Sequence, residues 1–299
     1  MNANFMQLDR LPSAGESLQA HGVFQEHGGK GLNLGVGLHR LGLKVRLLLG
    51  IGADNAGKSA REFLTSEGLD MRGVYDLPAN SGYGVGFIAT NGKNFLAAYH
   101  GANTLINEQH VQAQCQSMNQ LDWVCAQFEA PDNAILAAFE IGKQRGAMTY
   151  LNPSPWRTPS AQMLALTDVL VVNATEAALM FALPAAEHWD AQTWLTQLPT
   201  LPHPYAYLIV TLAEHGAISI SASGEIHHQA AFNITQIDAT GAGDAFGCGL
   251  VYALSQQCDI AHTLHLANAC GARVAASKGI LDALPYPTQI TEFIATQSN

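Results

Sequence analysis

A glycine-rich turn between a predicted strand and a predicted helix is the feature that most constrains this chain. Residues 238–244 read Asp-Ala-Thr-Gly-Ala-Gly-Asp. The preceding residues 232–237 have the apolar and β-branched content of a strand, and residues 245–254 carry small and apolar side chains at helical spacing. The pattern therefore predicts a strand that turns sharply into a helix.

This turn offers a place for an anion. At a helix N-terminus the backbone N–H groups of Gly241, Ala242 and Gly243 are expected to lack acceptors, and the helix dipole favours negative charge there. The carboxylate of Asp244 would repel an anionic ligand unless it takes a proton from a hydroxyl that attacks phosphorus. The alternative is that Asp244 is an ordinary first-turn residue that interacts well with the dipole.

The composition is that of an ordinary globular protein. The chain has 299 residues, 48% of them hydrophobic, which is enough for one large domain. The formal charge of -10 and the lack of a Lys/Arg run argue against a nucleic-acid partner. No segment reads as a signal peptide or a membrane span, so we expect no membrane contact and a cytoplasmic location. The cysteines lack Cys-x-x-Cys spacing, which argues against a disulfide framework and a cysteine zinc site.

From about residue 120 onward, strand-like and helical patterns alternate, which is typical of an α/β protein with a mostly parallel sheet covered by helices. We expect strands at residues 123–127, 148–151, 169–172 and 207–211, and helices at residues 133–145 and 174–183. Earlier, residues 85–90 and 94–99 alternate around Asn91-Gly92, a hairpin signal that predicts a small added sheet. We expect a single domain over residues 1–299.

Residues 52–59 match the P-loop spacing Gly-x-x-x-x-Gly-Lys-Ser and follow a strand-like run, residues 45–51. In a P-loop, Lys58 would reach the phosphates of a nucleotide and Ser59 would bind magnesium. This interpretation is a serious rival to the glycine turn described above.

The P-loop also needs an acidic residue at the end of a second strand. The candidate strands end instead in Asn173 and Thr211. We therefore favour the alternative in which Asp54 caps a helix over about residues 55–66, Gly68 ends it, and the side chain of residue 58 faces solvent.

Five separated motifs occur in the order and spacing seen in the ribokinase-like (PfkB-family) sugar kinases, and the chain resembles that family over nearly its whole length. The motifs are His27-Gly28-Gly29-Lys30-Gly31-Leu32-Asn33, Gly52-x-Asp54-x-x-Gly57, Asn173-Ala174-Thr175-Glu176, Thr211-Leu212-x-x-x-Gly216 and Asp238 to Asp244. The resemblance implies a three-layer α/β fold, with a mostly parallel central sheet flanked by helices and a small β-sheet lid formed within about residues 1–30 and 82–103.

The same resemblance implies an ATP-dependent sugar kinase. Asp244 would take a proton from a primary hydroxyl of a small, ribose-like sugar while that oxygen attacks the γ-phosphoryl group of ATP. Gly241, Ala242 and Gly243 would form the anion hole for the transferred group. These roles agree with what the turn suggests by itself.

Cation sites are implied as well. Asn173 and Glu176 would organise Mg2+ through water molecules, since a hard cation bridging phosphates needs few direct protein ligands. Asp238 and Thr240 resemble part of a K+ site found in some members. The alternative for Glu176 is a solvated helix residue.

The resemblance also assigns the ligand contacts. The ATP site would contain Asn173, Thr211, Gly216, Gly241, Gly243 and Asn268. The sugar site would contain Asn4, Gly28, Gly29, Lys30, Asn33, Glu129 and Asp244, because sugar hydroxyls need several hydrogen-bond partners once they lose water. Two alternatives stay open: residues 28–31 form only a tight turn before a helix, and Asn268 is a satisfied structural polar group.

Asn4 is a departure, because the family usually has an aspartate there that holds sugar hydroxyls. An amide donates as well as accepts, whereas a carboxylate only accepts, so we expect an altered choice of sugar or weaker binding. The complete strand that usually precedes this position is also absent, which leaves an earlier start of the chain, or a sheet position that another segment fills, as explanations.

Rival functions stay open. A nucleoside kinase of the same family would need an apolar slot for the base, and Phe95 and Tyr99 are candidates to supply it. A catalytically weak sugar or nucleotide sensor would fit the departures, although the intact Asp244 argues against it. Members of the family often pair lid to lid, so a homodimer through the lid is a further expectation.

Overall fold

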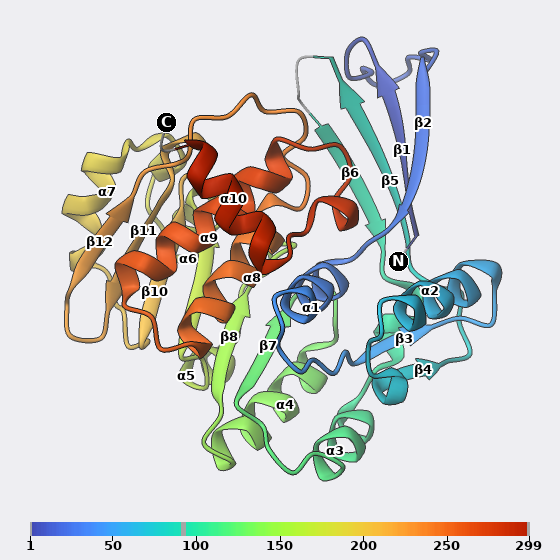
Figure 1. Cartoon of the computed structure of the whole chain (residues 1–299), viewed down its shortest axis with the longest axis horizontal. Coiled ribbons are helices and arrows are strands. Elements are labelled where there is room, and N and C mark those ends of the chain that lie inside the picture. The colour runs from blue at the N-terminus through green and yellow to red at the C-terminus, as the bar shows by residue number, and fades with distance from the viewer. Residues whose placement is uncertain (1, 91–93, 298–299) are drawn as a thin grey trace.

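The computed structural model describes residues 2–90 and 94–297. It shows a large sheet with helices on both faces and a smaller sheet that stands beside it (Figure 1). The expected three-layer α/β architecture with a small lid sheet is therefore confirmed.

The central sheet has the strand order β12-β11-β10-β9-β8-β7. Its strands are β7 (Trp123–Gln127), β8 (Met148–Asn152), β9 (Val169–Asn173), β10 (Tyr207–Thr211), β11 (Ala217–Ser221) and β12 (Ile226–Gln229). Strands β7 to β10 are parallel, and β11 and β12 continue the sheet antiparallel. The predicted parallel strands are confirmed to within a residue at each end.

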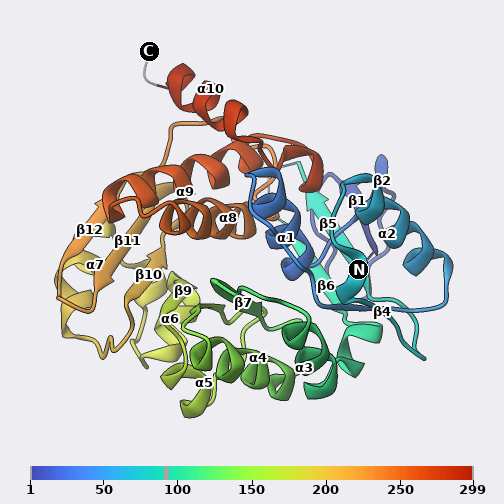
Figure 2. The same ribbon diagram turned by 60° about the horizontal axis from the view of Figure 1, so that its bottom comes forward.

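Two helical layers cover this sheet (Figure 2). One contains α1 (Lys30–Arg40), α8 (Ala242–Ser255) and α9 (Ile260–Ala275), and α10 (Pro287–Gln297) packs on α9. The other contains α3 (Glu108–Gln116), α4 (Asp132–Gln144), α5 (Ala161–Ala165), α6 (Ala174–Met180) and α7 (Ala191–Gln197). Short 3-10 segments lie at Met71–Gly73, Gly101–Leu105, Ala186–His188, Leu198–Thr200, Ala213–His215 and Leu281–Ala283.

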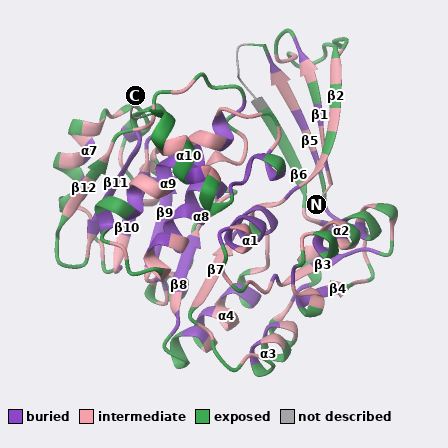
Figure 3. Cartoon of the chain, viewed as in Figure 1, coloured by how far each residue is buried: buried purple, intermediate pink, exposed green. Residues whose placement is uncertain are grey.

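The core has a part on each side of the sheet because the central strands are apolar on both faces (Figure 3). Along β9, Val169 and Val171 pack into the cluster under α1, α8 and α9, whereas Leu170 and Val172 pack into the cluster under the opposite helices. This division follows the two-residue period of a strand. Because β7 to β10 are parallel, their carboxyl ends lie at one edge of the sheet.

The small sheet has the order β2-β1-β5-β6. Its strands are β1 (Asn2–Leu8), β2 (Gly22–His27), β5 (Tyr83–Ala89) and β6 (Asn94–Tyr99). The two strands of the predicted hairpin, β5 and β6, are confirmed as an antiparallel pair. The predicted turn at Asn91-Gly92 lies outside the described residues. We call this sheet the lid.

A third, two-stranded parallel sheet contains β3 (Leu49–Ile51) and β4 (Val74–Asp76), and α2 (Asn55–Ser66) follows β3. Within the described residues, β3 pairs only with β4 and β7 pairs only with β8, so the two sheets share no strand.

Two predicted elements differ from the structure. The strand expected at residues 232–237 does not form: the N–H groups of Ile237 and Asp238 both donate to the carbonyl of Ala275 at the end of α9, so this segment is tied to a helix rather than to a strand. The helix expected at residues 174–183 stops at Met180. Ala182 has a φ of 52°, and a residue before proline, such as Leu183, is disfavoured in a helix.

Candidate active site

Asp244 lies in the first turn of α8, and its side chain is only 6% exposed. The side-chain amide of Asn33 donates a hydrogen bond of 2.7 Å to Asp244 Oδ2. The ammonium nitrogen of Lys30 lies 3.7 Å from Asp244 Oδ1. Both partners come from α1, which packs against α8, so the buried carboxylate has a fixed orientation and a balancing cation.

Gly241 and Gly243 differ in what a side chain at their position would contact. Gly241 has a φ of 78°, and a Cβ there would lie 2.4 Å from a methyl carbon of Ile280, so both conformation and space require glycine. A Cβ at Gly243 would meet nothing within 4 Å, which leaves open space in front of the helix. That space is where an anion at the helix N-terminus would lie.

The expectation of three unpaired amides needs a correction at Ala242. Its N–H donates to the carbonyl of Ala239 at 3.1 Å, because the chain makes a tight turn into α8. The N–H groups of Gly241 and Gly243 donate to no backbone carbonyl within the described part of the chain. The turn therefore presents two amides rather than three.

A second glycine turn lies at the start of α1. Gly29 caps this helix with a φ of 123°, in the region that favours glycine. The N–H of Lys30 donates to Glu129 Oε2 at 2.8 Å, and Glu129 follows the carboxyl end of β7. The structure thus brings together the lysine and the glutamate that the sequence assigned to sugar binding.

Nearby charge raises the pKa of Lys30, and burial raises the pKa of Glu129. Attraction to Asp244 raises the pKa of Lys30, so this side chain stays cationic at neutral pH. Removal from water raises the pKa of Glu129, and the nearby negative charge of Asp244 adds to this effect.

Two polar atoms of the predicted sugar site are buried without a hydrogen-bond partner. They are Oδ1 of Asn33, an acceptor, and Nδ2 of Asn4, a donor. Asn4 shares one face of β1 with Asn2, which lines a cavity together with Gly28 and Glu129. Buried polar groups without partners cost free energy, so they indicate a ligand that would satisfy them.

Asn173 and Glu176 form a reciprocal cap at the start of α6. Asn173 Oδ1 accepts from the N–H of Glu176 at 2.8 Å, and Glu176 Oε2 accepts from the N–H of Asn173 at 2.9 Å. Glu176 is buried rather than solvated, and desolvation raises its pKa. The alternative of a solvated helix residue is therefore wrong.

The remaining predicted nucleotide residues lie along the same edge of the sheet. Thr211 ends β10 directly beside Asn173, which ends β9. Gly216 has a φ of 89°, and a Cβ there would lie 2.0 Å from the carbonyl oxygen of Gln229. Asn268 on α9 donates to the carbonyls of Gln229 and Ala230, so its amide nitrogen has the structural role that the sequence left open.

Asp238 and Thr240 lie close together before the glycine turn. Asp238 Oδ1 accepts from the N–H and the hydroxyl of Thr240, at 2.9 and 2.6 Å. Nearby, Glu26 on β2 accepts from the N–H of Ile280 at 2.9 Å, and burial raises the pKa of its carboxyl. Glu26 was missed by the sequence reasoning, because nothing in the sequence pairs a lid residue with the segment at residue 280.

Gln127 is a second missed residue. It is buried at the carboxyl end of β7, and its amide reaches the carbonyl of Lys30 at 3.4 Å. A polar residue at the end of a predicted parallel strand is the signal that could have found it.

Residues 52–59 do not form a P-loop and instead begin a capped helix. Asp54 caps α2 and accepts from the N–H of Gly57 at 2.8 Å, and Gly68 adopts a φ of 78° after the helix. Lys58 is exposed, and Ser59 contacts His27 at 3.1 Å. The helix-cap interpretation is confirmed.

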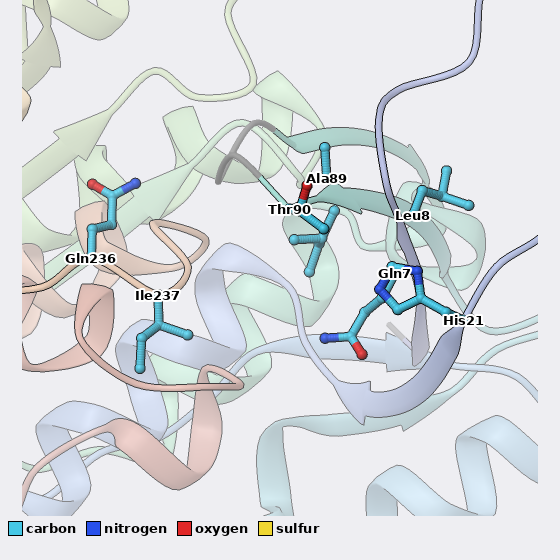
Figure 4. Close-up of a pocket in the computed structure, with 8 residues that line it drawn as sticks. Gln7, Leu8, His21, Ala89, Thr90, Gln236 and Ile237 are labelled. Carbon is cyan, nitrogen blue, oxygen red and sulfur yellow. The ribbon is translucent and has the colours of Figure 1, made fainter.

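The lid also faces the segment that leads into the glycine turn. A cavity of about 440 Å³ separates Leu8 and Thr90 of the lid region from Gln236 and Ile237 (Figure 4). The lid thus stands on the same side of the molecule as the turn that carries the proposed base. Among the described helices, none has the length and apolarity needed to cross a bilayer.

Comparisons with known proteins agree with this geometry. Residues 1–287 match the profile of the pfkB family carbohydrate kinases. The chain is 28% identical over 284 residues to a ribokinase of Haemophilus influenzae, which covers 94% of this chain and 91% of that protein. It is 27% identical over 290 residues to a deoxyribokinase of Salmonella typhi, with 96% and 94% coverage.

The fold has close structural neighbours. The structure of Arabidopsis thaliana ribokinase complexed with ribose and ATP superimposes with a TM-score of 0.82 at 20% identity, over 98% of this chain and 95% of that one. At this identity the likeness shows the fold alone. The family match spans nearly the whole sequence, and the chain therefore belongs to the pfkB family of carbohydrate kinases, enzymes that transfer a phosphoryl group to an alcohol.

Proposed function

We propose that this chain transfers the γ-phosphoryl group of ATP to a primary hydroxyl of a small, ribose-like sugar, with Asp244 as the general base. The observation that carries the proposal is the position of Asp244. Its carboxylate is buried, is oriented by Asn33, and belongs to the residue that directly follows the open glycine turn. A carboxylate next to an anion site is unfavourable unless it accepts a proton from the attacking hydroxyl.

The sugar oxygen forms a bond to the γ-phosphorus while the bond from that phosphorus to the β,γ-bridging oxygen breaks, and ADP leaves. The hydroxyl proton passes to the Asp244 carboxylate. The amides of Gly241 and Gly243 and the dipole of α8 would stabilise the negative charge on the transferred group. Lys30 would offset the charge of the nearby carboxylate.

Cations would act mainly through the nucleotide. Within residues 2–90 and 94–297, no group of three or more His, Cys, Asp or Glu side chains is placed to hold a metal ion. Mg2+ bound to the phosphates would neutralise their charge, with Asn173 and Glu176 positioning its waters; it needs few protein ligands for this. Asp238 and Thr240 would contribute to a K+ site. Thr211, Gly216 and the oxygen of Asn268 would line the nucleotide.

The sugar would lie between α1, β7 and the base of the lid. Gly28, Gly29, Lys30 and Glu129 would contact its hydroxyls from one side. The unpaired Nδ2 of Asn4 and Oδ1 of Asn33 would supply a donor and an acceptor. A donor and an acceptor together suit a polyol, because each hydroxyl group both donates and accepts hydrogen bonds.

The lid would also serve as a dimer interface. In the register of the lid, Met6, Val23, Phe95 and Tyr99 share one face, and Val23 is 71% exposed while Phe95 and Tyr99 are each 60% exposed. An apolar sheet face of this kind favours burial against a second copy. Light scattering tests this: Val23→Lys with Phe95→Lys should convert a dimer to a monomer, and a monomeric starting protein contradicts the proposal.

Phosphoryl transfer is tested with Asp244→Asn. This variant should bind sugar and ATP but lose kcat by about 10³-fold or more, since it keeps the shape of the site and removes the base. Lys58→Ala is the matched control, because Lys58 is exposed on α2, and it should leave kcat unchanged. If Lys58→Ala abolished turnover while Asp244→Asn kept it, the assignment would be wrong.

The substrate is identified by following ADP release with ribose, 2-deoxyribose, fructose, sugar phosphates and nucleosides. Ribose-like sugars should give the highest kcat/KM. A clear preference for nucleosides would favour the alternative of a nucleoside kinase, in which exposed Phe95 and Tyr99 would contact the base. Binding without turnover of any of these compounds would favour a sensor.

A further inference from the structure

Residues 278–284, which we call the connecting segment, run beside the lid between α9 and α10 (Figure 1). Glu26 on β2 contacts this segment, since its Oε2 accepts a hydrogen bond of 2.9 Å from the N–H of Ile280. Phe24, on the same face of β2, contacts it as well, because the ammonium nitrogen of Lys278 lies 5.3 Å from the centre of the Phe24 ring. The lid therefore contacts the connecting segment through two side chains of one strand.

The connecting segment also packs against the glycine turn. Ile280 is buried, and one of its methyl carbons would lie 2.4 Å from a Cβ added at Gly241. No side chain fits between the two residues, so a movement of Ile280 would displace the turn. Removal from water raises the pKa of Glu26, and the negative charge of Asp238, at the start of the turn, adds to this effect. Glu26 is therefore close to the glycine turn as well as bonded to the segment that covers it.

Arg40 of α1 holds the other end of the connecting segment. Its guanidinium donates to the carbonyls of Leu281 and Leu284, the second at 3.1 Å. Arg40 also pairs with Glu67 at 2.6 Å, and its side chain is only 8% exposed, so this end of the segment is fixed to the helices. Glu26 differs from Arg40 because it belongs to the lid. Within the described residues, the four lid strands pair with no strand of the central sheet.

Glu26 lies next to the proposed sugar site along two strands. On β2 it precedes Gly28 by two residues. Across the lid it pairs with Ala3 of β1, the neighbour of Asn4, whose amide nitrogen is buried without a partner. A sugar that contacts Gly28 and Asn4 would therefore fix the pair of strands that carries Glu26.

We propose that Glu26 is a positioning residue that couples the sugar site to the glycine turn through its hydrogen bond to Ile280. The inference rests on the proposed function, because that function supplies the two ligands. A sugar that fixes β1 and β2 also fixes the carboxylate of Glu26, which holds Ile280 against Gly241 and so sets the direction of the turn amides. Sugar binding thus raises the affinity for the nucleotide, and the nucleotide raises the affinity for the sugar by the same factor.

Isothermal titration calorimetry measures this coupling with ribose and with AMP-PNP and Mg2+, a nucleotide analogue that cannot transfer its terminal phosphoryl group. In the starting protein, saturating ribose should lower the Kd of AMP-PNP by about fivefold or more. Glu26→Ala should reduce this ratio to about twofold or less, while the Kd of AMP-PNP without ribose changes little. Glu26→Gln is the matched control and should keep the ratio, because its amide oxygen still accepts from the N–H of Ile280.

Ile280→Ala tests the second contact, because it keeps the N–H that donates to Glu26 and removes the side chain that packs against Gly241. It should also reduce the ratio to about twofold or less. Hydrogen exchange of the protein without ligands is a readout that does not depend on binding. Glu26→Ala should speed exchange both in residues 278–284 and in residues 239–244, whereas Glu26→Gln should speed neither.

An unchanged ratio in Glu26→Ala would overturn the proposal, because a purely structural role would weaken both ligands alike and leave the ratio as it was. Ribose that binds the starting protein without any effect on AMP-PNP would overturn it too. Faster exchange in residues 278–284 alone would show that Glu26 orders the connecting segment without acting on the glycine turn. Ribose that does not bind at all would instead contradict the proposed function, and the exchange rates would still decide whether Glu26 acts on the turn.

Discussion

Asn33 and Asp244 are 211 residues apart in the sequence, yet the amide of Asn33 donates a 2.7 Å hydrogen bond to the carboxylate of Asp244 inside the molecule. The two side chains come from α1 and α8, which pack side by side. The other polar atom of the Asn33 amide, Oδ1, is buried without a partner. This residue therefore orients the proposed base with one atom and presents an acceptor with the other.

The Asn33→Ala variant should lower kcat/KM by about 10- to 100-fold, because a hydrogen bond to a charged group is worth about 1.5–3 kcal/mol. A loss of carboxylate orientation reduces kcat, and a loss of the Oδ1 acceptor raises KM for the sugar. Steady-state kinetics with sugar and ATP varied separately distinguish the two effects.

Asn33→Asp is the matched control, since it keeps the size and the acceptor but removes the donated hydrogen bond and adds a like charge. It should lower kcat further than alanine does. An aspartate variant as active as the starting protein would contradict the orienting role.

The ammonium nitrogen of Lys30 lies 3.7 Å from Asp244 Oδ1, and its replacement should lower activity. Lys30→Met leaves the buried carboxylate without this positive charge and removes a proposed contact to the sugar, so kcat/KM should fall by about 10- to 100-fold. Lys30→Arg keeps the charge and should lose much less. Steady-state kinetics measure the difference, and an unchanged kcat/KM in the methionine variant would show that this cation does not act at the site.

The parallel strands could be predicted from the sequence because their signals are local. Short apolar runs such as Trp123–Gln127 and Tyr207–Thr211 suffice to identify buried strands, and both were placed correctly. The cap at Asp54 was also predictable, since a cap depends on a few neighbouring residues.

Contacts between distant segments had no such local signal. The strand expected at residues 232–237 does not form, because the N–H groups of Ile237 and Asp238 donate hydrogen bonds to the carbonyl of Ala275. Nothing in the sequence around residue 237 encodes that partner. The hydrogen bond from Ile280 to Glu26 was missed for the same reason. The site could be assigned only because several motifs agree in order.

Asp54 should contribute to stability and little to catalysis. Its carboxylate accepts from the N–H of Gly57 and from both the N–H and the hydroxyl of Ser81. Asp54→Ala should lower the free energy of unfolding by about 1–2 kcal/mol, as expected for a lost helix cap, with kcat changed less than about twofold. Asp54→Asn should lose less stability than Asp54→Ala, because its amide oxygen still accepts from the N–H of Gly57 while its amide nitrogen cannot accept from the N–H of Ser81. Denaturant unfolding measures the difference, and a large loss of kcat in Asp54→Ala would reopen the P-loop interpretation.

Glu129 should make the protein less stable as pH rises. Desolvation raises the pKa of its carboxyl in the folded state. The stability that this side chain contributes is therefore fully present below the unfolded pKa of about 4.3 and is lost as pH rises through the higher folded value. Glu129→Gln removes this dependence and still accepts the hydrogen bond from Lys30. Its Tm should exceed that of the starting protein most at pH 8, and the gap should close toward pH 4.5. A constant gap across this range would show that Glu129 does not titrate differently on folding.

Asn4 should set the choice of sugar, because Nδ2 of its amide is a buried donor without a partner. Asn4→Asp removes that donor and leaves two acceptors, which suit a sugar that offers hydroxyl donors. We expect Asn4→Asp to lower KM for ribose by about tenfold relative to KM for 2-deoxyribose, which has one hydroxyl fewer, because a hydrogen bond to a carboxylate is worth about 1.5–3 kcal/mol. The value of kcat should change little, since Asp244 is untouched. Asn4→Ala is the control and should raise KM for both sugars. If Asn4→Asp raised both KM values equally, the amide donor itself would be the required group, and the preference between the two sugars would have to arise elsewhere in the site.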